Sequence, residues 1–217
     1  MKVLGSVFII GILFFTFTAC RKDKTPEPED DWFTCTYGEN FSIIYDTTKK
    51  TEGLIPLSFY NYWVYADTIW TADGTMVSTS IDTAWSGNLR KTNSDLWWSI
   101  VGPTPIKTVH YGENKLYTLE RGFTGCIYKS MRYYEATADT THDGIGMHGD
   151  IAISRKVYKS GSIISTPAGD FEDCSVLDLD YYTTYQILKP GVGFVKFANG
   201  DYNGGYREYT LISYHLE

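Results

Sequence analysis

The chain has 217 residues, and 43% of them are hydrophobic. Its formal net charge of −7 argues against binding to nucleic acid or anionic lipid, because such proteins gather Lys and Arg on one surface. Aromatic residues make up 16% of the chain, and Thr, Val and Ile are frequent, which is typical of β-sheet proteins.

The N-terminus predicts an export signal. A positive start at Met1-Lys2 precedes a run from Val3 to Phe17 that is apolar apart from a few small residues. That run is shorter than the ~20 apolar residues a membrane-spanning helix needs, and small residues precede the expected cleavage site. Residues 1–19 are therefore predicted to be a signal peptide.

A cysteine stands at the expected boundary. The stretch Phe17-Thr18-Ala19-Cys20 resembles a bacterial lipobox, although Leu is usual where Phe17 stands. The resemblance implies acylation of Cys20, and each buried CH2 of an acyl chain then contributes ~0.8 kcal/mol to membrane anchoring. The alternative is an ordinary signal peptide that leaves Cys20 as a free thiol.

The following segment predicts a flexible tether. The sequence after Cys20 is RKDKTPEPEDD, which is charged and contains no apolar side chain able to support folding. Residues 20–31 would hold a single β domain, residues 32–217, away from the membrane. Lys22-Asp23 resembles an export signal of Bacteroidetes lipoproteins. We therefore expect an outer-membrane lipoprotein, and its side, periplasmic or cell-surface, stays open.

Strand and turn patterns predict an all-β fold. Residues 60–70 and 76–85 are β-branched and aromatic and flank Asp73-Gly74, a strong hairpin signal. Further turns are predicted at 112–114 and at Ser160-Gly161, and short helices near 39–45 and 90–96. We expect about ten strands in one strongly curved antiparallel sheet, either open as a half-barrel or closed into a barrel. Other predicted strands are 96–101, 125–134, 150–158, 171–181, 183–188, 193–197 and 206–216.

Three sequence blocks then carry a family resemblance. They are LIPLSFYNYWVY at 54–65, TPAGDFEDC at 166–174, and KPGVGFVKF at 189–197 followed by YTLISY at 209–214. In this order they resemble the TapB-like family of exported bacterial lipoproteins, whose function is unknown. The resemblance implies export and a β fold but no reaction. The Pro and Gly residues also have a structural explanation, as a turn at 167–169 and a sharp strand start at 190–193.

The segment DTTHDGIGMHGD, residues 139–150, contains the strongest candidate for metal chemistry. Imidazole and carboxylate groups suit a divalent cation, and the candidate ligands are His142, Asp143, His148 and Asp150. The spacing matches no known metal motif, so a solvated loop between strands is the favoured interpretation. We predict no cofactor. An envelope hydrolase or a metal-dependent enzyme remains the alternative function, although G-x-S-x-G is absent.

Clustered tryptophans suggest a binding surface. Trp63, Trp70, Trp85 and Trp97 could stack a sugar ring or an apolar ligand, whereas β-sheet proteins also use such residues to fill their cores. We therefore expect a non-enzymatic module that binds a glycan, a lipid or an envelope protein through its concave or aromatic face.

Lipidation of Cys20 leaves three thiols for the folded domain. One disulfide at most can then form within the chain, and Cys126 with Cys174 is the preferred pair. Three buried free thiols are the alternative.

Overall fold

The computed structural model describes residues 42–91, 95–112, 115–121, 127–134, 142–148, 151–179, 184–200 and 204–217. Residues Asp31–Glu217 form one compact unit. The described residues contain strands and no helix, so none of their segments is a helix able to cross a membrane. The predicted short helix near 90–96 is wrong, because Arg90 and Lys91 end one strand and Leu96 begins the next.

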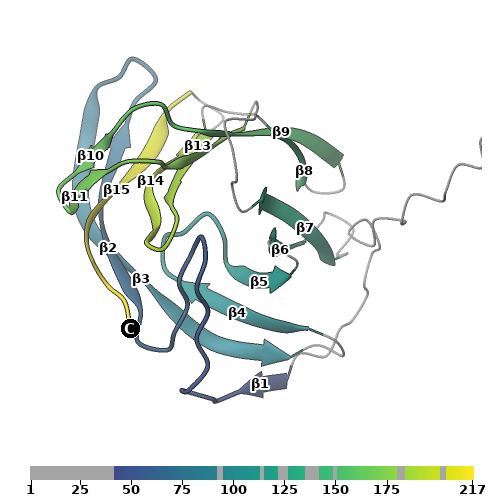
Figure 1. Cartoon of the computed structure of the whole chain (residues 1–217). Helices are drawn as coiled ribbons and strands as arrows, with labels where there is room; N and C mark the ends of the chain where they lie inside the picture. Colours follow the sequence, from purple (N-terminus) through teal and green to yellow (C-terminus); the bar gives the residue numbers. More distant parts are fainter. Residues whose placement is uncertain are drawn as a thin grey trace, which may run out of the picture. The chain divides into compact units, whose positions relative to one another are not determined.

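The described residues form fifteen strands (Figure 1). They are β1 (Ser42–Ile44), β2 (Tyr62–Trp70), β3 (Met76–Lys91), β4 (Leu96–Val101), β5 (Thr108–Gly112), β6 (Lys115–Arg121), β7 (Ile127–Tyr134), β8 (His142–His148), β9 (Ile151–Lys159), β10 (Ile164–Thr166), β11 (Gly169–Phe171), β12 (Ser175–Leu179), β13 (Thr184–Lys189), β14 (Gly193–Gly200) and β15 (Tyr206–His215).

Thirteen strands form one antiparallel sheet in the order β7-β6-β5-β4-β3-β2-β15-β14-β13-β12-β9-β8, with β1 added beside β3. The predicted all-β antiparallel sheet is confirmed, in its open form, since no ladder closes the two ends among the described strands. The β10–β11 hairpin is separate.

Local turn chemistry explains the hairpins. Gly74 takes φ +80° in the β2–β3 turn, where its N–H donates to the Thr71 carbonyl at 3.0 Å. The predicted turn at 167–169 joins β10 to β11, and the turn at 190–192 joins β13 to β14. The chain turns at Ser160-Gly161 as predicted, but the flanking strands form no hairpin, because β9 pairs with β12 and β10 pairs with β11. Strand order thus depends on pairing between distant segments.

Register defines two faces of the sheet. One row across the strands contains Leu177, Gln186, Phe197, Tyr209 and Asp67, all buried. We call this side the core face. The neighbouring row, Val176, Ile187, Lys196, Thr210, Ala66 and Ile81, points the other way, because successive strand residues alternate, and defines the outer face.

The segment between β1 and β2 fills the core face. Leu54, Ile55 and Leu57 are at most 2% exposed and pack with the aromatic side chains of the sheet. The Tyr111 hydroxyl accepts a hydrogen bond from the Ile55 N–H at 2.7 Å and donates one to the Ile55 carbonyl at 2.6 Å. This side of the sheet is therefore packed protein core around these residues.

Candidate functional site

A groove lies against the outer face of β12, β13 and β14. It has a volume of about 690 Å³, within the usual range of small-molecule sites. The crossing segment 160–165 forms one wall, and side chains of the sheet form the floor. The groove therefore lies between a connection and the sheet.

Strand register builds the floor. Tyr158 is opposite Val176, Val176 is opposite Ile187, and Ile187 is opposite Lys196, so the four side chains form one row across β9, β12, β13 and β14. Neighbouring strands are ~4.8 Å apart, which makes this row about 14 Å long. It is apolar in the middle and carries a cation at one end.

A charged network borders the cation end. Lys196 Nζ lies 3.1 Å from Glu208 Oε2, and the Tyr185 hydroxyl donates a hydrogen bond to the same oxygen. Tyr185 and Glu208 are on β13 and β15, two strands apart. Ala198 on the intervening strand is in register with Glu208, and its small side chain leaves room for the Tyr185 ring to cross β14.

The network is suited to binding polar groups. Burial, and then the hydrogen bond to Glu208, raise the pKa of Tyr185, so its phenol stays protonated and remains a donor. An ammonium group has three N–H donors, and the salt bridge to Glu208 uses one of them. The opposite charges of Lys196 and Glu208 cancel locally, which favours a neutral polar ligand over an anion.

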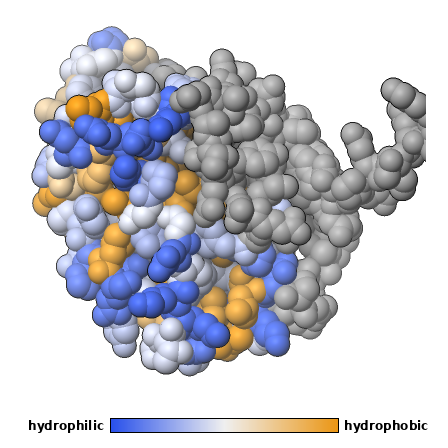
Figure 2. Space-filling view, viewed as in Figure 1, coloured by the Kyte–Doolittle hydropathy of each residue, from blue (hydrophilic) through white to orange (hydrophobic). Residues whose placement is uncertain are grey.

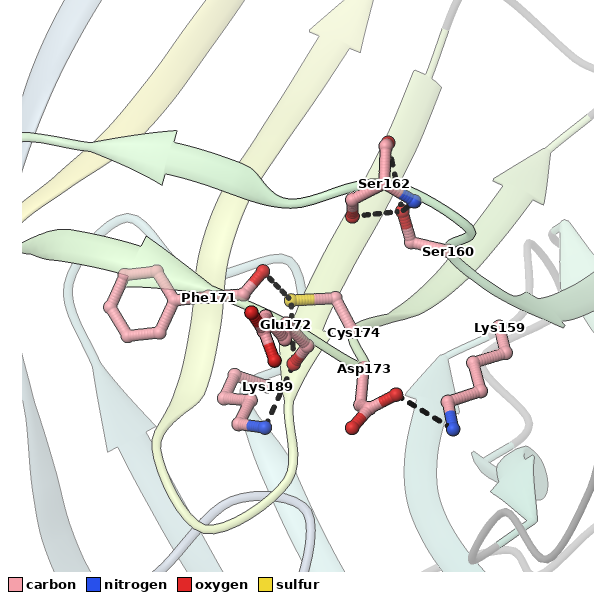
Figure 3. A network of polar contacts seen from close by, with 8 residues as sticks. All are labelled: Lys159, Ser160, Ser162, Phe171, Glu172, Asp173, Cys174 and Lys189. Carbon is pink, nitrogen blue, oxygen red and sulfur yellow. Dashed lines mark hydrogen bonds and ion pairs between the residues drawn. The ribbon is translucent and has the colours of Figure 1, made fainter.

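A second network positions the wall of the groove (Figure 3). The Ser160 N–H donates to the Cys174 carbonyl at 2.7 Å, which ties the start of the crossing segment to the residue before β12. The Ser160 hydroxyl donates to the Ser162 carbonyl at 2.9 Å and accepts from the Ser162 N–H at 3.3 Å. The segment is thus held in a tight turn beside the sheet.

Charged side chains hold the segment between β11 and β12, next to this turn. Lys159 Nζ lies 2.8 Å from Asp173 Oδ1, and Lys189 Nζ donates to the Glu172 carbonyl at 2.8 Å (Figure 3). The hydrogen bond from Lys159 lowers the pKa of Asp173. Asp173 has φ +54°, the left-handed conformation that Asp tolerates better than most residues. This kink divides the predicted strand 171–181 into β11 and β12.

Two of the four predicted binding tryptophans belong to the core. Trp63 and Trp97 are each 2% exposed, and the Trp63 indole N–H donates to the Val192 carbonyl at 2.6 Å. Trp97 packs near the His110 ring, with 5.1 Å between centroids. Neither ring can present a face to a large ligand.

The other two tryptophans lie at the surface but far apart. Trp85 is 46% exposed and is opposite Tyr62, whereas Trp70 stacks on Tyr206 with 5.9 Å between ring centroids. Tyr62 and Trp70 are the two ends of β2, and eight residues of strand separate them by about 26 Å. The structure therefore does not bring the four predicted residues together.

The predicted metal segment is a strand where we favoured a loop. Residues His142–His148 form β8, which pairs with β9 from His142 opposite Val157 to His148 opposite Ile151. Six residues of strand separate the two histidine backbones by about 20 Å, so β8 does not bring them to one ion. Asp150 lies outside the described residues, and no cluster of three metal-ligating residues occurs among those described. Asp143 lies between the two histidines on β8. The metal site stays a prediction.

The cysteine predictions are tested only in part. Cys174 is a buried free thiol whose Sγ lies 3.6 Å from the Phe171 carbonyl oxygen, and burial raises its pKa. Its proposed partner Cys126 lies outside the described residues, as does Cys20. The disulfide stays a prediction.

Sequence reasoning did not find the groove. Tyr185, Lys196 and Glu208 lie on three consecutive strands, 11 and 12 residues apart, and carry no motif. The available signal was the strand alternation that places Lys196 and Glu208 on one face, with the small Ala198 between Tyr185 and Glu208. Recognising it requires the exact register of β13, β14 and β15, including the bulge between Ile187 and Leu188, which the sequence does not specify.

The comparisons with known proteins assign no family. No family model matches the chain, and no curated protein matches it. A crystal structure of a Parabacteroides distasonis protein, provisionally described as a lipoprotein, covers 77% of this chain and 100% of its own, with 12% identity and a TM-score of 0.40. This likeness is too low to assign a common fold, and the resemblance to the TapB-like family stays a prediction.

Proposed function

We propose that the chain is a lipid-anchored protein of the bacterial outer membrane whose β domain binds a neutral polar ligand, such as a short glycan, in the groove beside β12–β14. The anchor is Cys20, and the support for it is the lipobox-like sequence at 17–20 with its charged tether. The domain sits on the periplasmic or the cell-surface side.

The observation that carries the binding proposal is the mixed chemistry of the groove. Hydroxyl groups from Ser160, Ser162 and Tyr185 face the same 690 Å³ space as the apolar side chains of Val176 and Ile187. A sugar ring presents hydroxyl groups at its edge and C–H groups on its faces. It can therefore contact both kinds of lining at once, whereas a purely apolar chain would displace water from Lys196 and the hydroxyl groups without replacing those hydrogen bonds.

Binding is favoured over catalysis at this site. The carboxylate of Glu208 is bound by both Lys196 and Tyr185, so it is engaged as a structural acceptor. General acid–base chemistry on a glycoside uses two carboxyl groups across the scissile bond, and Glu208 is the one carboxylate of the described network. A non-enzymatic module therefore fits the groove best.

A glycan-array screen of the domain Asp31–Glu217, followed by calorimetry with the best ligand, tests the proposal. Lys196→Met removes the cationic donor with little change in side-chain volume. A hydrogen bond to a charged group contributes about 1.5 to 3 kcal/mol, so affinity should fall about 10- to 100-fold. Tyr185→Phe removes one hydroxyl and should weaken binding by a smaller factor.

The matched control is Lys91→Met, which removes the same charge from an exposed position on β3, away from the groove. Its affinity should equal that of the unchanged protein, and thermal unfolding checks that each variant is folded. A screen that enriches no ligand would refute the binding proposal. A ligand whose affinity is unchanged in Lys196→Met would place the site elsewhere.

A further inference from the structure

A second cavity lies in the other half of the sheet, between β3–β5 and the segment that follows β1. Its volume is about 370 Å³, at the lower end of the range for small-molecule sites. At ~30 Å³ for each water-sized group, it can hold about a dozen non-hydrogen atoms. None of its described lining residues lines the groove beside β12–β14, so the cavity and the groove are separate spaces.

The floor of this cavity is apolar. Leu89 is opposite Trp98 in the β3–β4 ladder, and both side chains are buried members of the hydrophobic core. The Phe59 ring packs edge-on against Trp98, with 5.5 Å between ring centroids, which holds the indole in one position. Leu96 is 40% exposed and lines the same space. An apolar ligand group placed against these side chains would be removed from water, which is favourable.

Backbone hydrogen bonds position the wall of the cavity. The chain turns after β1, where the Lys49 N–H donates to the Asp46 carbonyl at 3.3 Å. Thr51 then pairs with Leu57 through two backbone hydrogen bonds, of 2.8 and 3.2 Å. Because Leu57 is fully buried, this pairing ties the wall to the core. Lys50 lies between the turn and the pairing, and both lysines line the cavity.

The two lysines carry positive charge that no ion pair neutralises. In the part of the chain that the structure describes, neither ammonium group lies within ion-pair distance of a carboxylate. Asp46 is near Lys49, but its carboxylate accepts hydrogen bonds from the Thr48 N–H and hydroxyl, at 3.1 and 2.6 Å. The ammonium groups are therefore available to an anionic ligand.

The carboxylate in the described lining lies beside a different partner. Asp95 Oδ1 is 3.9 Å from His110 Nε2, and the other nitrogen of that ring is 2.9 Å from the Leu96 carbonyl oxygen. Two lysines against one carboxylate leave the lining with a surplus of positive charge. The whole chain has a net charge of −7, so this surplus is a local property of the cavity.

Apolar exposure alone does not mark this cavity as a site. On the face seen in Figure 2, small apolar patches alternate with hydrophilic residues across the surface. What distinguishes the cavity is an apolar floor that is recessed and is bordered by two cations. A ligand that matches it must supply both an apolar body and an anionic group.

We propose that this cavity binds a small carboxylate with an apolar body, such as an arylalkanoate. The carboxylate binds Lys49 and Lys50 through charge-assisted hydrogen bonds, and the apolar body lies against Leu89, Leu96 and Trp98. The space of about a dozen non-hydrogen atoms suits a single ring with a short acid chain. A long acyl chain would extend out of the cavity.

Isothermal titration calorimetry of the full chain in nonionic detergent tests the ligand class. The probe is 3-phenylpropionate, with an expected dissociation constant of about 1 mM, which is usual for so small a ligand. Its amide keeps the shape without the charge, and propionate keeps the charge without the ring. Each should bind about fivefold more weakly or less tightly still. Micelles take up the neutral amide more readily than the anion, so the detergent biases this comparison against the expected result.

Variants of the two lysines test the position of the site. Lys49→Met with Lys50→Met should weaken 3-phenylpropionate about tenfold and leave the affinity of the amide unchanged. Lys49→Glu with Lys50→Glu should reverse the preference, so that protonated 3-phenylpropylamine binds more tightly than the carboxylate. Lys159→Met removes one cation from β9, outside the cavity, and is the control that should change neither affinity. Both lysines of the cavity are exposed, so these variants should fold, which circular dichroism checks.

Three outcomes overturn the proposal. The first is no binding of 3-phenylpropionate up to about 20 mM. The second is equal affinity for the carboxylate and its amide, which would mean that the lysines do not select an anion. The third is an affinity that the double methionine variant leaves unchanged, which would place the site elsewhere. The cavity and the groove share no described lining residue, so failure of either binding proposal leaves the other standing.

Discussion

Tyr65 provides a test of how burial of a phenol stabilises the sheet. Its side chain extends from β2 into the core, where it is fully buried. Its hydroxyl donates to the Phe194 carbonyl at 3.0 Å. Tyr65→Phe keeps the ring, which makes edge contacts with Phe197 and Tyr209, and removes the hydrogen bond. At pH 8 we expect the variant to lose about 1 kcal/mol of unfolding free energy.

Alkaline pH should erase this difference. Burial raises the pKa of Tyr65 well above its ordinary value. The stabilisation that this shift provides is complete below the unfolded pKa of about 10 and is lost as pH rises, because only the unfolded chain then releases the proton. At pH 11 ionisation of one unfolded tyrosine lowers the stability of the unchanged protein by about 1 to 2 kcal/mol, and Tyr65→Phe escapes that loss.

The assay is urea unfolding followed by tryptophan fluorescence, for both proteins, at pH 8 and pH 11. Every other titrating group is common to the two proteins, so its effect cancels in the difference. We expect the variant to be less stable at pH 8 and equal or more stable at pH 11. The same difference at both pH values would refute the reasoning, because it would mean that Tyr65 ionises equally in the folded and unfolded chain.

Two further predictions concern the backbone and a buried charge. Gly102 has φ +107°, and an added Cβ would lie 2.4 Å from the Thr83 carbonyl oxygen, so Gly102→Ala should cost about 3 kcal/mol or more in chemical unfolding. Gly74→Ala, at φ +80° with no atom within 4 Å, isolates the conformational cost of about 1 to 2 kcal/mol, and equal losses would contradict the steric account. Arg207 binds the buried carboxylate of Asp67 through two nitrogens, at 2.8 and 2.7 Å, and its guanidinium side chain is 50% exposed. Arg207→Met should therefore lower the unfolding free energy by about 1 to 2 kcal/mol, which is less than the loss of a fully buried pair would cost. Adding Asp67→Asn should recover part of that loss. No recovery in this double-mutant cycle would mean that the pair is not coupled.

The parts of the fold that local chemistry decides could be predicted from the sequence. Asp73-Gly74 predicts its hairpin because glycine supplies the positive φ that the turn requires. The alternation in β15 correctly predicts two faces, with Tyr209 and Leu211 on the core side. A bulge at Ile212 then shifts the pattern, so that Tyr214 falls opposite Trp63. Such a bulge depends on the neighbouring strand and leaves no local signal.

The candidate site could not be predicted because it depends on contacts between distant segments. Trp63 and Trp85 both lie in predicted strands, yet one fills the core and the other faces solvent, since their strand positions point to opposite faces. For the crossing segment beside the groove, the sequence favours a hairpin, because Ser160-Gly161 suits a turn. In the structure this segment is a connection instead, because β9 pairs with β12.

The position of β15 has a consequence for the order in which the domain can fold. β15 lies between β2 and β14, so it joins strands β1–β7 on one side to strands β8, β9 and β12–β14 on the other. Of the described strands, β15 comes after all the others in the chain. The hydrogen-bonded ladder between the two parts of the sheet therefore cannot form until this segment is in place. Deletion of β15 should consequently leave β2 and β14 each with an unpaired edge and no ladder joining them, although it removes a single strand.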